Sequence, residues 1–199
     1  AKELRIPEKL EAAWATIVQG KERKIDLPIA EITRDGKNER RYFAQLAGAG
    51  LDAQAIELVD WETKRRFGQL AYVYAGVKAL FRPHPMIEAR SGADTVQGEL
   101  VLIGNGKYYG GRVPMFPDAR LDDGKLDVCV FPRVGLGAVM KFLFWLCLGR
   151  FRHAHPARHF STDQLELVST ETAMFELEGD VAGRLPVRVA NHEYGHHLA

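Results

Sequence analysis

The chain has 199 residues, which is enough for one domain with a sizeable buried core. Its 27 basic residues almost balance its 26 acidic ones, so net charge gives no support for a nucleic-acid partner, and we expect none. Two cysteines, Cys129 and Cys147, lie in apolar stretches, which favours buried thiols in a reduced, cytoplasmic protein over a disulfide. The first residues lack the apolar centre of a signal peptide, so secretion is not indicated.

The first predicted element is an amphipathic helix over residues 7–19. Its apolar side chains recur with the spacing of one helix face at Leu10, Ala13, Trp14, Ile17 and Val18. Two extended segments then flank a D-G turn at Asp35 and Gly36, which predicts a β-hairpin. Between residues 53 and 80 the pattern is helical again, and a break near Phe67 and Gly68 indicates two helices.

After these helices, short runs with strand-like patterns follow one another at regular intervals. The runs are residues 86–92, 95–105, 126–132, 163–169, 173–179 and 185–190. This order predicts an α+β, mainly β fold, namely an antiparallel β-sandwich with a few helices packed on it. The apolar stretch 136–149 contains Lys141 and is shorter than the ~20 residues of a spanning helix, so we expect a buried or interfacial helix there.

Near its end the chain contains the pattern H-E-x-x-H at residues 192–196, which in metalloproteases binds zinc. That chemistry requires a helix, because only a helix brings both imidazoles to one face. Residues 185–190 predict a strand instead, and Gly195 lies inside the required helix. We therefore interpret the match as fortuitous.

Two further segments carry residue types that a plain β-sandwich does not need. In the first, Gly48 and Gly50 precede Asp52, so the glycines either permit a tight turn into a helix capped by Asp52 or leave room for a ligand. In the second, Asn105 follows a strand, and Asp122, Asp123 and Gly124 form a turn (the DDG turn). This turn is either that of a hairpin or a site for a hard cation bound by carboxylate and carbonyl oxygens.

A third segment, residues 175–187, places Glu178 and Asp180 on either side of Gly179. In a strand both carboxylates would point to one face, where they repel each other unless water, a cation or a proton lies between them. The alternative is a solvated hairpin tip.

Taken in this order, the three segments resemble the C-terminal domain of the diacylglycerol kinase-like lipid kinases, of the bacterial diacylglycerol and sphingosine kinase type, in the superfamily related to NAD kinase. The family's aromatic residue and Gly-x-Gly-x-Asp-Ala turn are matched by Phe43, Gly48, Gly50, Asp52 and Ala53. Its later G-N, G-G and P-x-A-x-x-x-D-G-x-L-D run is matched by Gly104, Asn105, Gly110, Gly111, Pro117, Ala119, Asp123, Gly124, Leu126 and Asp127. The resemblance covers nearly the whole chain.

The resemblance implies that a β-sandwich, residues 26–199, follows a smaller nucleotide-binding domain with a G-G-D-G-T loop. That loop does not occur in this sequence, and residues 1–25 resemble the connection that follows it. We therefore expect this chain to be the substrate-binding and catalytic-base half of a kinase. By itself it is expected to be inactive, because ATP would bind mainly to the other half.

In the family the catalytic base is the glutamate of an Asp-Gly-Glu motif. This sequence has Glu178, Gly179 and Asp180, so the base maps onto Asp180, whose side chain is shorter by one methylene, about 1.5 Å. Family members also hold a structural Mg²⁺, which maps onto the side chain of Asp123 and the backbone carbonyls of Arg120 and Lys125. Around the substrate the resemblance places Gly48, Gly50, Asp52, Asn105 and Glu178.

The implied reaction transfers the γ-phosphoryl group of ATP to the hydroxyl of a lipid such as diacylglycerol. The apolar helix at residues 139–148 would then dip into the inner face of the membrane, unless it is a core helix followed by a solvated basic loop. The basic residues that follow it are Arg150, Arg152, His153, His155, Arg158 and His159. The alternatives are a non-catalytic lipid-binding or scaffold module of the same fold and a soluble kinase of a nucleotide or NAD, and an edge strand also permits a homodimer.

Overall fold

A computed structural model describes residues 2–20, 22–34, 36–58, 75–76, 78–110, 113–147 and 157–191 of the chain, the side chains of residues 142–147 excepted. Its helices are α1 (Leu10–Gln19), α2 (Leu51–Glu57) and α5 (Leu136–Cys147). Its strands are β1 (Ile29–Arg34), β2 (Lys37–Tyr42), β3 (Leu46–Gly50), β4 (Ile87–Ser91), β5 (Asp94–Gly98), β6 (Leu100–Gly104), β7 (Leu126–Phe131), β8 (Arg158–Thr162), β9 (Gln164–Ser169), β10 (Met174–Leu177) and β11 (Asp180–Ala190).

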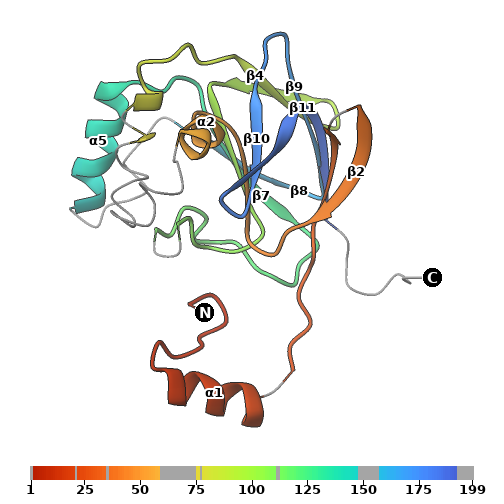
Figure 1. Ribbon diagram of the computed structural model, residues 1–199, viewed down its shortest axis with the longest axis vertical. Coiled ribbons are helices and arrows are strands. Elements are labelled where there is room, and N and C mark those ends of the chain that lie inside the picture. The colour runs from red at the N-terminus through yellow and green to blue at the C-terminus, as the bar shows by residue number, and fades with distance from the viewer. Residues whose placement is uncertain are drawn as a thin grey trace.

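The strands form one antiparallel sheet in the order β5-β4-β9-β11-β10-β3-β6-β7-β8, and β1 and β2 are joined to it through β11. The sheet folds back on itself, because β5 and β4, at one end of this order, contact β7 and β6 near the other end. Figure 1 shows the strands around a common interior, with α2 and α5 to one side of them. The predicted antiparallel β-sandwich is confirmed.

The interior of the folded sheet holds the main hydrophobic core. Its largest side chains include Phe43, Ile87, Ile103, Leu126, Leu167 and Phe175. A second apolar cluster lies on the other face of β6 and β7, where Met115 and Phe116 pack with Leu102 and Cys129. These two strands are therefore apolar on both faces, and the connection between them is held against the sheet.

Two local predictions have clear outcomes. The D-G hairpin is confirmed, because Arg34 pairs with Lys37 and Gly36 has a φ of 74°, a value that glycine adopts readily. The solvated basic loop is wrong for Arg158 and His159, which lie in β8 and pair with β7. The sequence did not predict this strand, because the sheet buries only part of β8 and most of its residues are polar.

Helix α1 confirms the predicted amphipathic helix, but it lies apart from the sheet (Figure 1). None of its residues, all of which the structure describes, is buried, and its large apolar side chains range from Val18 at 62% exposed to Leu10 at 80% exposed. Just before the helix, the chain contacts the connection after β6, where Lys107 donates its backbone N–H to Glu3 at 3.0 Å.

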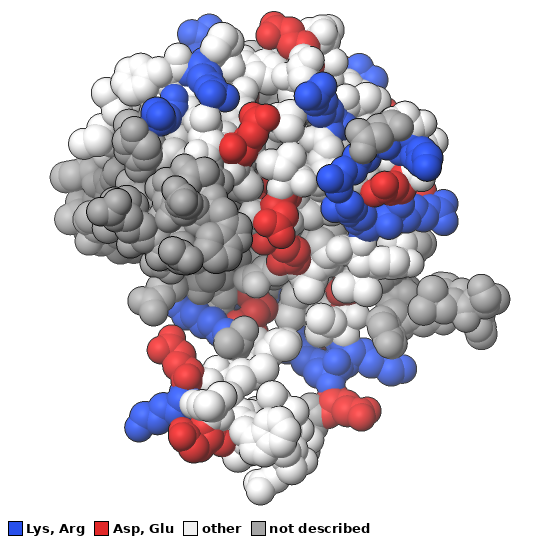
Figure 2. All heavy atoms as spheres, viewed as in Figure 1, with Lys and Arg blue, Asp and Glu red and all other residues white. Residues whose placement is uncertain are grey.

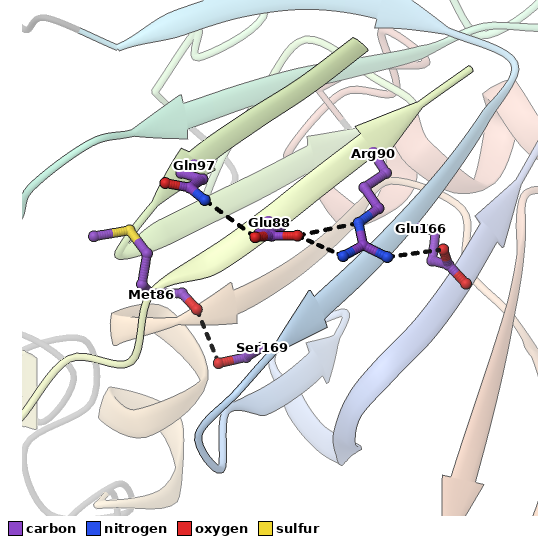
Figure 3. Close-up of polar contacts among 6 residues, drawn as sticks. All are labelled: Met86, Glu88, Arg90, Gln97, Glu166 and Ser169. Carbon is purple, nitrogen blue, oxygen red and sulfur yellow. Dashed lines mark hydrogen bonds and ion pairs between the residues drawn. The ribbon is translucent and has the colours of Figure 1, made fainter. Parts of the chain in front are cut away.

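A row of alternating charges crosses the exposed face of the sheet. Directly paired positions on β2, β1, β11, β9 and β4 hold Arg40, Glu31, Arg188, Glu166 and Arg90. Figure 3 shows one end of this row, where Arg90 lies between Glu88 and Glu166 and Glu88 accepts a hydrogen bond from Gln97. A groove of about 590 Å³ runs over the row. Because the row's charges already pair across strands, we assign it to strand pairing rather than to a ligand site.

Several predictions fall outside the described residues. They are the joint between two helices near Phe67 and Gly68, the H-E-x-x-H pattern at residues 192–196, and the basic side chains Arg150, Arg152, His153 and His155.

Cys129 is a buried free thiol, and burial raises its pKa above the usual range.

Candidate active site

The hairpin between β10 and β11 carries the two acidic residues that the sequence singled out. Leu177 pairs with Asp180, so Glu178 and Gly179 form a two-residue turn. Both have positive φ, 54° and 86°, as the central residues of a type I′ turn do. The strand alternation expected for Glu178 and Asp180 is therefore wrong, because Glu178 lies in the turn itself. We call Glu178, Gly179 and Asp180 the acidic tip.

The acidic tip is fixed to the chain that enters β3. One carboxylate oxygen of Glu178 accepts the backbone N–H groups of Ala44 at 2.6 Å and Gln45 at 2.7 Å. The backbone N–H of Glu178 donates to the carbonyl of Leu46 at 3.0 Å. These bonds hold a non-glycine residue in a left-handed conformation that it would otherwise avoid. The Glu178 carboxylate thus serves the structure of the tip.

Asp180 has a different environment from Glu178. It is exposed, as the first residue of β11. Its carboxylate forms no hydrogen bond or ion pair with any residue that the structure describes. Of the two acids of the tip, Asp180 is the one whose carboxylate is not engaged by backbone N–H groups.

A second pair of acids, which we call the acid pair, lies beneath the tip. Glu176 is fully buried on β10, opposite Gly48 of β3, and its Oε2 accepts the backbone N–H of Gly179 at 2.7 Å. Asp52, in the first turn of α2, accepts a hydrogen bond from the hydroxyl of Tyr109. A Cβ atom at position 48 would lie 2.9 Å from Asp52 Oδ2 and 3.0 Å from Glu176 Oε1. Gly48 therefore leaves room for two carboxyl groups of the protein itself.

Burial dominates the acid-base properties of this cluster. It raises the pKa of Asp52, against the opposing effect of the hydrogen bond from Tyr109. Burial and, second, the Asp52 carboxylate raise the pKa of Glu176 to about 9. The same two causes raise the pKa of Tyr109 well above its usual value.

Neither Glu176 nor Tyr109 stands out in the sequence as a site residue. Glu176 lies between Phe175 and Leu177, a pattern that predicts a side chain facing solvent. The face that it occupies is buried instead, because α2 packs against β3 and β10 there. The only local indication of Glu176 in the sequence was Gly48. Glycine has no side chain, so it leaves space for the long side chain of its cross-strand partner, Glu176.

The two other predicted substrate residues have structural roles. A Cβ atom at Gly50, whose φ is 93°, would collide with the carbonyl oxygen of Glu99, so this position needs glycine. Asn105 is fully buried and donates its side-chain amide to the carbonyls of Ala44 at 2.9 Å and Asp26 at 3.1 Å. Ala44 also binds Glu178, so Asn105 braces the acidic tip from behind.

The DDG turn is connected to this bracing. Asp26 accepts the backbone N–H of Gly124 at 2.8 Å, while its own carbonyl accepts the amide of Asn105. The turn does not join two paired strands, because residues 114–121 before it form no strand and β7 after it pairs with β6, which ends at Gly104. A chain of hydrogen bonds therefore runs from the DDG turn through Asp26, Asn105 and Ala44 to the acidic tip.

The donor set at the DDG turn suits a hard cation. Burial, then the carboxylates of Asp123 and Asp118, raise the pKa of Asp127 to about 6, so added positive charge would be favourable here. In the described part of the chain no three acidic, His or Cys side chains converge on one point. A magnesium ion would thus depend on Asp123 and on the carbonyls of Arg120 and Lys125, and the latter carbonyl also accepts a bond from Asn191 at 2.9 Å. Oxygen ligands of this kind fit Mg²⁺.

The surface around the hairpin tip carries negative charge. Figure 2 shows acidic side chains in a column down the middle of the face on which the β10–β11 hairpin lies in Figure 1, with a dense basic group to its right. An anionic phosphate group would need a cation, or basic residues from elsewhere, to approach this column.

Comparisons with known proteins agree with this architecture. Residues 45–194 match the family model described as the YegS C-terminal NAD kinase beta sandwich-like domain. A YegS-like lipid kinase from Stenotrophomonas maltophilia is 35% identical over 132 residues, which cover 65% of this chain and 41% of that protein. A diacylglycerol kinase from Staphylococcus saprophyticus is 26% identical over 192 residues, which cover 94% of this chain and 60% of that protein.

The fold also agrees with a solved structure. The crystal structure of a diacylglycerol kinase from Bacillus anthracis superposes with a TM-score of 0.67 at 19% identity, over 96% of this chain and 61% of that one. This chain spans about half the length of the curated relatives that it matches. It belongs to the YegS C-terminal NAD kinase beta sandwich-like domain family, and it is similar to proteins named as lipid kinase and diacylglycerol kinase.

Proposed function

We propose that this chain is the substrate-binding and catalytic-base half of an ATP-dependent lipid kinase that phosphorylates the hydroxyl of a diacylglycerol-like lipid. The observation that carries the proposal is the exposed carboxylate of Asp180 on a tip that hydrogen bonds hold on both sides. The names of the relatives supply the class of reaction.

Among the three acids of the hairpin, Asp180 is the best candidate for the base. The Glu178 carboxylate accepts two backbone N–H groups, and Glu176 is fully buried. Asp180 would accept the hydroxyl proton while the lipid oxygen forms its bond to the γ-phosphorus and the bond to the β-phosphate oxygen breaks, releasing ADP. A base held on a fixed tip loses little entropy when the substrate arrives.

Magnesium has a place in this proposal at the DDG turn. Asp123 and the carbonyls of Arg120 and Lys125 would hold the ion, whose positive charge would offset the carboxylates of the turn. By fixing the DDG turn, the ion would also help to hold the acidic tip in place, because hydrogen bonds through Asp26 and Asn105 connect the two. ATP would bind mainly to a nucleotide-binding domain outside this chain.

Contact with a membrane surface fits the exposed side chains of α5. Leu136 is 54% exposed and Met140 is 58% exposed, and Lys141 beside them is exposed too. A core helix would bury these apolar groups, so their exposure favours an interfacial helix whose cation meets anionic headgroups. Within the described ranges no helix has both the length and the apolar character to cross a bilayer.

The proposal is tested by transfer of labelled γ-phosphate from Mg-ATP to diacylglycerol, ceramide, sphingosine and phosphatidylglycerol, with the protein in its complete natural form. We expect label in one lipid, lost in Asp180→Asn and kept in Asp94→Asn, which changes an exposed aspartate at the start of β5. A folded, ATP-binding protein that labels none of these lipids would refute the proposal.

The shorter side chain of Asp180 favours a second candidate, a non-catalytic lipid-binding module of the same fold. The same assay separates the two if Asp180→Glu is included, because this variant restores the length found in the family. Label in the glutamate variant alone, with lipid binding unchanged, would identify the natural protein as a binding module.

A further inference from the structure

The acid pair, Asp52 and Glu176, has no role in the chemistry proposed above. Glu176 is fully buried, and its Oε1 finds no hydrogen-bond donor among the described residues. Asp52 faces it across the space left by Gly48. Two ionised carboxylates only accept hydrogen bonds, and in a buried site they repel strongly.

The other oxygens of the pair are accounted for. Glu176 Oε2 accepts the backbone N–H of Gly179, and Asp52 Oδ1 accepts the hydroxyl of Tyr109. The two remaining oxygens, Glu176 Oε1 and Asp52 Oδ2, are the ones that flank Gly48. A single proton on Glu176 Oε1, donated to Asp52 Oδ2, satisfies both of them and removes the repulsion.

We propose that Asp52 and Glu176 share one proton, and that the protonated pair is a positioning device that holds Gly179, and with it the acidic tip, in place. The link to catalysis rests on the proposed function of Asp180. The shared proton does not depend on that function, because it follows from the contacts of the pair alone.

The pair makes the tip sensitive to alkaline pH. Burial, Asp52 from α2 and Glu178 from the tip raise the pKa of Glu176 from an ordinary 4.5 to about 9, against the opposing effect of the hydrogen bond from the Gly179 amide. Between these values the folded state keeps a proton that the unfolded chain has released. Stability therefore falls as pH rises from about 4.5, and the fall ends once pH passes about 9.

Infrared spectroscopy tests the proton without any need for activity. Above a pH of about 6, the pKa of Asp127, that residue is ionised and gives no signal of a protonated carboxyl group. Below a pH of about 9, the pKa of Glu176, the pair keeps its proton. Between these limits the complete natural protein should show the C=O band of a buried protonated carboxyl group. The band should vanish in Glu176→Gln, whose amide can donate to Asp52 in the proton's place. It should persist in Glu171→Gln, an exposed control. A wild-type protein without the band would overturn the proposal.

Denaturation as a function of pH provides the second test. Between pH values of about 6 and 9 the folding equilibrium constant of the wild type should fall by up to tenfold per pH unit relative to that of Glu176→Gln. Parallel profiles for the two proteins would overturn the shared proton. The shared proton would also be overturned if a chelator lowered the stability of the wild type but not that of Glu176→Gln. That result would show that a divalent cation bridges the pair.

The link to catalysis is tested separately. Phosphoryl transfer should decline in the wild type as pH approaches about 9, with a smaller decline in Glu176→Gln, which keeps the hydrogen bond to Gly179. An infrared band without transfer to any lipid would leave the pair standing and refute the kinase proposal. Transfer with identical pH profiles in both proteins would refute the positioning role.

Discussion

Glu178 should stabilise the hairpin tip through its carboxylate and strain it through its backbone, and substitution can separate the two effects. The carboxylate accepts two backbone N–H groups, at 2.6 and 2.7 Å. Hydrogen bonds to a charged group contribute about 1.5–3 kcal/mol each, and exposure to water reduces this, so we expect about 2–3 kcal/mol for the two together. The φ of 54° costs a non-glycine residue about 1 kcal/mol.

Glu178→Ala removes the bonds and keeps the unfavourable backbone, so it should lower the free energy of unfolding by about 2–3 kcal/mol. Glu178→Gly removes the bonds but relieves the backbone, so its loss should be smaller by about 1 kcal/mol. Glu178→Gln keeps the geometry without the charge and should lie nearest to the wild type. Chemical denaturation followed by circular dichroism measures all three.

The order of stability is the decisive result for this series. We expect the free energy of unfolding to be highest for the wild type and to decrease in the order Glu178→Gln, Glu178→Gly and Glu178→Ala. A glycine variant less stable than the alanine variant would show that the backbone strain is absent. An alanine variant as stable as the wild type would refute the claim that the carboxylate holds the tip.

Two more predictions concern positions around the tip. Gly50→Ala should destabilise the protein by at least about 3 kcal/mol, since its Cβ meets the Glu99 carbonyl at a φ of 93°; a loss below about 1 kcal/mol in chemical denaturation would contradict this. Asp123→Asn should reduce the rise in melting temperature that Mg²⁺ produces in the wild type, because it removes the carboxylate of the predicted site, and an equal rise in both proteins would place the ion elsewhere.

Local patterns were enough to predict much of the fold. Apolar spacing predicted α1, and the D-G pair predicted the hairpin of β1 and β2. Alternation predicted most of the strands, because one face of each contributes to the interior of the sheet. Strand β8 was missed, since its residues follow an apolar helix in sequence and carry little apolar pattern of their own.

The candidate site could be predicted only in part, because its geometry depends on residues far apart in sequence. Asp180 and Glu178 were both singled out, yet their different roles come from Ala44, which is 134 residues away from Glu178. Glu176 had the pattern of a solvent-facing residue, and only the packing of α2 on that face buries it. Asn105 was assigned to substrate, and its contacts with Ala44 and Asp26 give it a bracing role instead.

The measurement that bears most directly on the role of Asp180 is the rate of phosphoryl transfer by Asp180→Asn, relative to wild type, at saturating lipid and Mg-ATP. Loss of a general base lowers the rate by about 10²–10⁴-fold. We predict a loss in this range with an unchanged melting temperature, because the Asp180 carboxylate has no hydrogen bond or ion pair among the described residues to lose. A rate within a fewfold of wild type would show that Asp180 is not the base.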